Sequence, residues 1–181
     1  SVWASSLVLS GFMAGMAFGS AWAARLGERL RSPLLAFVLL ELIVAGSGLL
    51  LVYELPSLTP LLAAASWGLE RAPFLLNLSR FGLAFALMLV PSTAMGMTLP
   101  LLARGVRAWD PNFGRVLGVL YGVNTLGAAG GVLVCELAFV EAFGIRHSAL
   151  AAVGFNFAAA ALGWLAIRGS TVRPTPVTAK F

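Results

Sequence analysis

The chain has 181 residues, of which 60% are hydrophobic and only 10% are charged. An average soluble domain carries about 25% charged residues, so this composition excludes an ordinary water-soluble fold and indicates a polytopic membrane protein. The net charge of +5 comes from basic residues scattered singly around apolar blocks. Nucleic acid is therefore not expected as a partner, because its phosphate backbone requires a continuous basic stripe.

Apolar length, charges and prolines together predict an all-α transmembrane bundle of about five spanning helices. In chain order these cover residues 2–24, 33–53, 81–103, 116–140 and 148–167. Residues 57–79 are interrupted by Pro60, Arg71 and Pro73, so they predict an interfacial helix with Trp67 at headgroup level; a sixth span is the alternative. The transmembrane domain is then residues 1–168, and residues 169–181 form a cytoplasmic tail or linker.

The basic residues predict the orientation of these helices. Most of the 12 fall on one side of the five-helix arrangement, which the positive-inside rule makes cytoplasmic; they are Arg25, Arg29, Arg31, Arg104, Arg107, Arg115, Arg168, Arg173 and Lys180. Arg71, Arg80 and Arg146 fall on the other side. We therefore expect an integral protein of the bacterial inner membrane, with the N-terminus outside and the C-terminus in the cytoplasm. A further helix upstream of Ser1 is also expected.

Small residues predict which helices pack closely. Glycines recur at four-residue spacing in the first and fourth predicted helices, where they let two backbones approach without a hydrophobic driving force. They are Gly11, Gly15 and Gly19, then Gly118, Gly122, Gly127 and Gly131. We expect both helices to be interior, with the glycines serving either static packing or a sliding surface.

Polar residues inside the apolar segments are the candidate site. Glu41 lies in an otherwise apolar run, where a carboxylate is costly unless it faces the protein interior, is hydrogen bonded or is protonated. Counting from the cytoplasmic ends at 1.5 Å per residue brings other polar residues to a similar depth beside Gly15. They are Thr93, Asn124, Thr125 and Asn156. This layer is either a structural clamp or a binding or proton site.

Four stretches resemble the membrane-embedded domain of spermidine synthase-like proteins. Residues 120–131 (LYGVNTLGAAGG), with Gly144-Ile145-Arg146 further on, match a "YxxNTLGAxxG…GLR" pattern. Residues 1–31, 40–42 (LEL) and 91–102 (PSTAMGMTLPLL) match three more of its helices, so the resemblance covers almost the whole chain. Glu28 replaces the aspartate usual in the loop after the first helix.

The resemblance implies helices similar to the major facilitator type, normally followed by a cytoplasmic aminopropyltransferase domain. None of the enzymatic residues of that domain maps to this chain, and no cofactor or metal site is expected. His147 is interpreted as an interfacial, solvated side chain. Three functions stay open: a non-catalytic domain that anchors or organises a partner, a transporter-like module for a small, possibly cationic, solute, and an accessory subunit of a larger membrane complex. The expected partners are lipid and either other membrane subunits or a cytoplasmic domain.

Overall fold

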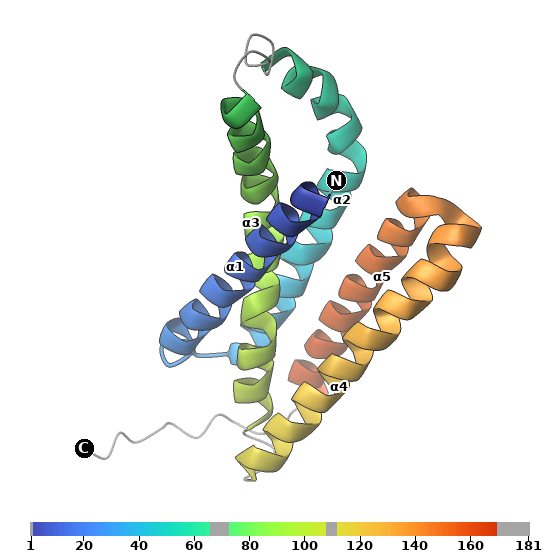
Figure 1. Cartoon of the computed structure of the whole chain (residues 1–181). Helices are drawn as coiled ribbons and strands as arrows, with labels where there is room; N and C mark the ends of the chain where they lie inside the picture. The colour runs from blue at the N-terminus through green and yellow to red at the C-terminus, as the bar shows by residue number, and fades with distance from the viewer. Residues whose placement is uncertain (1, 66–72, 108–111, 170–181) are drawn as a thin grey trace.

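The computed structural model describes residues 2–65, 73–107 and 112–169, and these are helical apart from short connections. The helices are α1 (Val2–Leu26), α2 (Pro33–Ala65), α3 (Pro73–Val106), α4 (Phe113–Val134), a π-helical segment η2 (Cys135–Phe139) and α5 (Val140–Gly169). Figure 1 shows them as elongated rods in one bundle. The predicted all-α fold is confirmed for this part of the chain.

Three helical stretches are long and apolar enough to cross a membrane: residues 33–54, 74–106 and 113–169. The last stretch has 57 residues and is not one straight rod, because Gly144 has a non-helical backbone with φ 74° and ψ 169°. Figure 1 shows the chain reversing there, so that α4 with η2 forms one arm and most of α5 forms the other.

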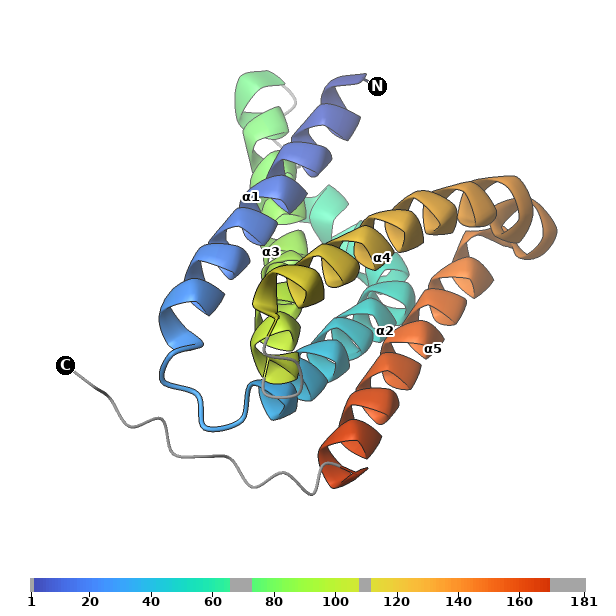
Figure 2. The ribbon, with the colours of Figure 1, turned by 90° about the horizontal axis from the view of Figure 1, so that it is seen from below.

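The bundle is held by three helix pairs. α1 packs on α3, α2 packs on α3, and α2 packs on α5. The buried core is correspondingly small in cross-section: Phe37, Val38 and Ala160 form one cluster between α2 and α5, while Ala94 and Leu101 are buried on α3. Figure 2, along the bundle, shows α1 on the far side of α3 from α5.

The predicted interfacial helix is wrong for the residues that the structure describes between 57 and 79. Residues 57–65 continue α2, and residues 73–79 begin α3. Pro56 and Pro60 lie inside α2 rather than ending it, and Figure 1 shows α2 bending over this part. A proline removes one backbone donor and pushes against the preceding turn, so a helix can continue through it with a kink. Trp67 lies outside the described residues, as does the predicted tail from residue 170 onward.

Candidate functional site

The first glycine repeat lies where α1 crosses α3. A Cβ atom on Gly11 would stand 3.1 Å from Phe85 Cδ2, one on Gly15 would stand 2.8 Å from Ser92 Cβ, and one on Gly19 would stand 3.1 Å from Gly96 Cα. These distances leave no room for a side chain. The backbones of α1 and α3 are therefore in close contact over two turns, as a small-residue interface in lipid requires.

Hydroxyl groups make this interface polar as well as tight. Ser92 is fully buried beneath Gly15, and its Oγ donates to Met88 O at 2.6 Å. Ser20 Oγ donates across the interface to Gly96 O at 3.0 Å. Neither serine was among the predicted site residues. Their positions within the runs that carry Gly19 and Pro91 could have indicated them, because serine is one of the small residues typical of transmembrane interfaces.

The same two helices are joined again at their arginine-rich end. Arg104, in the last turn of α3, donates from Nη2 to Ala24 O of α1 at 3.2 Å. The same nitrogen lies 4.0 Å from Glu28 Oε1 in the following loop. Gly27 is buried against the Arg104 side chain, where a Cβ would be 2.8 Å from Nη1. Arg104 thus satisfies a carbonyl at the end of α1 that has no helical partner, and fixes the loop after it.

Glu41 and Asn156 lie on the facing sides of α2 and α5. Val38 meets Gly163 and Gly48 meets Val153, so the two pairs are ten residues apart on each helix, as an antiparallel pair requires. Glu41 is one turn from Val38 and Asn156 one turn from Val153 on these same faces. In this register Glu41 stands opposite Ala160, about one turn or roughly 6 Å from Asn156 along the axis.

The two side chains differ in their hydrogen bonding. Asn156 Nδ2 donates to Ala152 O, one turn back on its own helix, at 3.0 Å. Glu41 is half-buried and makes no side-chain hydrogen bond or ion pair with the described residues. Residue counting therefore places one carboxyl group and one amide near the contact between α2 and α5.

Thr93 belongs to a different interface. Its backbone lies against Gly15 and Gly19 of α1, and the side of α3 that meets α2 is marked instead by Gly105, which packs on Leu34. Counting from that contact places Glu41 level with Thr98 of α3, five residues or about 7 Å from Thr93. The predicted polar layer is thus divided: Thr93 lies between α1 and α3, whereas Glu41 and Asn156 lie on α2 and α5.

Asn124 and Thr125 lie at neither of these interfaces. Every residue from 121 to 138 is exposed, and Val116 is the only buried residue of α4. Among the described residues, no Cα atom of α4 comes within 8 Å of one in α1, α2 or α5. Figure 2 shows the two arms diverging away from their turn at Gly144.

The second glycine repeat is consequently open. A Cβ atom on any of its members would have no neighbour within 4 Å; they are Gly118, Gly122, Gly127 and Gly131. The prediction that this helix is interior is wrong for the described chain. The reason is that glycine spacing predicts a surface able to pack closely, but does not determine whether another helix lies on it.

The described residues hold no group of three or more His, Cys, Asp or Glu side chains that could bind a metal ion. Cys135 is exposed in η2. His147 is exposed near the turn at Gly144, and its Nδ1 lies 2.9 Å from Phe143 O, a geometry in which Nδ1 carries the proton and donates. Nearby, the Arg146 guanidinium stacks over the Tyr53 ring at 4.9 Å and links α5, shortly after its turn at Gly144, to α2.

Comparison with protein-family models, curated proteins and solved structures finds no match to this chain.

Proposed function

We propose that this chain is a non-catalytic membrane domain of the spermidine synthase-like kind, which anchors or organises a partner through the open face of α4. The observation that carries the proposal is the unbroken exposure of residues 121–138. The four glycines of the second repeat have empty space in front of them, and Asn124 and Thr125 place polar groups on the same exposed segment.

The physical reason is the poor match between such a surface and lipid. A glycine-rich face gains little from contact with acyl chains, but it lets another helix approach closely enough for van der Waals contact. An interhelical hydrogen bond to Asn124 or Thr125 adds about 0.6 kcal/mol in the average transmembrane case. A second helix that supplies both contacts is therefore the favoured neighbour of α4.

The proposal includes five membrane crossings, made by α1, α2, α3 and the two arms that meet at Gly144. The 57-residue apolar stretch supports two of these, because about 20 residues suffice for one crossing and its chain reverses at Gly144. The arginine-rich ends of α1, α3 and α5 then face the cytoplasm.

Copurification tests the partner surface. The chain is expressed from its own reading frame in its native membrane, purified in mild detergent, and analysed by intact mass of the complex. Gly122→Leu and Gly127→Leu should lose a partner that the parent retains, whereas Gly154→Leu on α5, also in open space, should keep it. Equal recovery with all three variants would contradict the proposal. Recovery of several subunits in fixed ratio would favour the accessory-subunit function instead.

A transporter-like function is the second candidate, and the facing positions of Glu41 and Asn156 favour it. A polar pair at a helix interface near the membrane midplane is where many transporters hold substrates. Glu41→Gln should keep the fold, because the amide retains shape and hydrogen bonding, while binding or transport of labelled spermidine in vesicles falls sharply. Glu54→Gln, exposed at the outer part of α2, is the control. If Glu41→Gln bound and transported spermidine as the parent does, the transporter function at this site would be contradicted and the scaffold function would be favoured.

A further inference from the structure

Three arginines at the end of α1 have no acidic partner among the described residues. Arg25 is in the last turn of α1, and Arg29 and Arg31 are in the loop that follows; all three are exposed. The one acidic residue of this loop, Glu28, lies beside Arg104, which offsets its charge. The loop therefore carries an uncompensated charge of about three positive units on a short stretch of chain.

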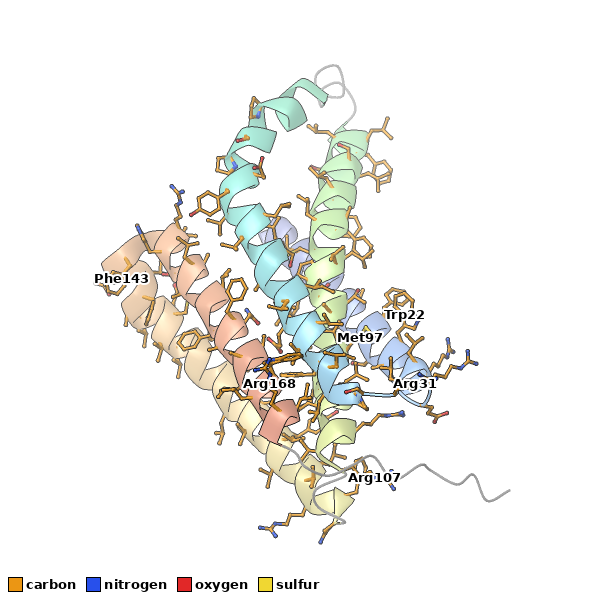
Figure 3. The ribbon with its side chains drawn as sticks, turned by 180° about the vertical axis from the view of Figure 1, so that it is seen from behind. Trp22, Arg31, Met97, Arg107, Phe143 and Arg168 are labelled. Atoms are coloured by element: carbon orange, nitrogen blue, oxygen red, sulfur yellow. The ribbon has the colours of Figure 1, made fainter. Side chains whose placement is uncertain are left out.

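These arginines continue an apolar face of α1. Phe18 and Trp22 are 63% and 56% exposed, and with Arg25 they have the i, i+4, i+7 spacing of one helix face. Figure 3 shows Trp22 on the side of α1 away from α5, and Arg31 at the end of the molecule where α1 is connected to α2. A tryptophan at this position is typical of the headgroup level of a membrane. The face thus passes from apolar, through the interfacial ring, to cationic.

The other arginines at this end are arranged differently. Arg107 stacks over Phe113 and Arg168 stacks over Trp164, each at 5.2 Å from the ring centroid. Arg104 is held by Ala24 O and Glu28. Arg107 and Arg168 are exposed as well, but their guanidinium groups are stacked on rings. Arg25, Arg29 and Arg31, like Arg115 at the start of α4, make no side-chain hydrogen bond, ion pair or ring contact with the described residues.

We infer that this corner binds an anionic phospholipid, with its phosphate on the arginines Arg25, Arg29 and Arg31 and an acyl chain along Trp22 and Phe18. Guanidinium groups pair with phosphate oxygens through two parallel hydrogen bonds. In a zwitterionic headgroup, the cation of the lipid itself neutralises the phosphate, so the attraction to arginine is weaker. Basic clusters next to membrane helices on the cytoplasmic side attract anionic lipids in the same way. An acidic protein or a nucleic acid would match the arginines but not the apolar face below them.

The proposed lipid site is separate from the proposed partner surface, because it lies on α1 and the loop after it rather than on α4. It rests on the proposed placement of α1 in the membrane. A protein that keeps its partner but shows no lipid preference would contradict this inference alone.

Lipid retention by the purified protein tests the inference. The detergent-solubilised chain is mixed with phosphatidylglycerol or phosphatidylcholine of the same acyl chains, and bound lipid is counted by native mass spectrometry. We expect retention of phosphatidylglycerol over phosphatidylcholine. Arg25→Gln and Arg29→Gln should each lower the affinity for phosphatidylglycerol about fivefold. Arg29→Lys should keep most of it, and Arg146→Gln at the opposite end should leave it unchanged.

Thermal melting of each variant in detergent separates loss of lipid from loss of fold. None of the three arginines makes a side-chain hydrogen bond or ion pair within the described chain, so the melting temperatures should equal that of the parent. Equal retention of the two lipids would overturn the inference, as would parental retention of phosphatidylglycerol by a folded Arg29→Gln variant.

Discussion

Gly15 is the residue at which a single added side chain should do the most damage. Its position on α1 faces the fully buried Ser92, with Thr93 N 3.4 Å from the site of a Cβ atom. Leucine there would force α1 and α3 apart, and overpacking of this kind costs about 1–3 kcal/mol. We expect Gly15→Leu to melt at a lower temperature than the parent in detergent, measured by circular dichroism.

Gly82 of α3 supplies the matched control. It is exposed, and a Cβ atom there meets nothing within 4 Å. Gly82→Leu should melt with the parent or slightly above it, because leucine is the better helix former. The same outcome is expected for Gly127→Leu in the isolated chain. If Gly15→Leu and Gly82→Leu melted together, the close contact of α1 with α3 would be wrong.

At the candidate site, the sequence could predict the depth of a residue along its helix but not the direction of its side chain. Glu41 is conspicuous because charge is rare in hydrocarbon, and in the structure it is half-buried. Depth along a helix is a local property, so Glu41, Thr93 and Asn156 could be placed at similar heights from sequence. The direction of each side chain around its helix is set by helix neighbours. For that reason the sequence did not show that Asn124 stands apart.

At the scale of an element, Gly144 determines the reversal between the two arms of the apolar stretch of residues 113–169. Its φ of 74° with ψ of 169° lies in a region that is essentially restricted to glycine. A residue with a Cβ atom would be strained by about 1–3 kcal/mol there. We expect Gly144→Ala to lower the melting temperature in detergent, and cysteines placed on the two arms near the turn to cross-link less efficiently.

Gly154→Ala is the control for that change, since Gly154 lies in the straight part of α5 with open space around it. Alanine is favoured over glycine in a helix by about 1 kcal/mol, so this variant should be as stable as the parent or more stable. A Gly144→Ala protein as stable as Gly154→Ala would show that the turn has another conformation.

The lengths of α2 and α3 were not predicted correctly from the sequence. Both exceed the predicted spans by about a dozen residues, because prolines and polar residues were treated as helix ends. Pro56 and Pro60 lie inside α2, beyond its predicted end at residue 53, whereas Pro91 and Pro100 lie inside α3, as the predicted span over residues 81–103 already allowed. A proline costs one hydrogen bond and bends the helix, but neighbouring helices can make that cost acceptable. The π-helical turn at η2 has no sequence signal of comparable strength.

At the scale of the whole molecule, the helix directions bring most of the arginines to the same end of the bundle. The helices α1 and α3 are parallel, since Gly15 meets Ser92 and Gly27 meets Arg104, while α2 runs opposite to both. This places Arg25, Arg29, Arg31, Arg104 and Arg107 at one end. Figure 3 shows Arg31, Arg107 and Arg168 toward that end and Phe143 toward the other. Charge bias in the sequence therefore predicted which ends lie together, although it could not predict which helices touch.

The final prediction is the side of the membrane on which each end lies. In a Cys135→Ala background, Ser32→Cys reports the loop after α1, and Asn77→Cys reports the opposite end near the start of α3. By the positive-inside rule, the end with the arginines is retained in the cytoplasm. A membrane-impermeant maleimide added to intact cells should therefore label Asn77→Cys and leave Ser32→Cys unlabelled until the cells are opened. Both substitutions keep every arginine, so neither changes the signal that sets the orientation. Labelling of Ser32→Cys from outside, with Asn77→Cys protected, would show that the topology is the opposite one. The loop with Arg29 and Arg31, and with it the proposed lipid site, would then lie on the external face.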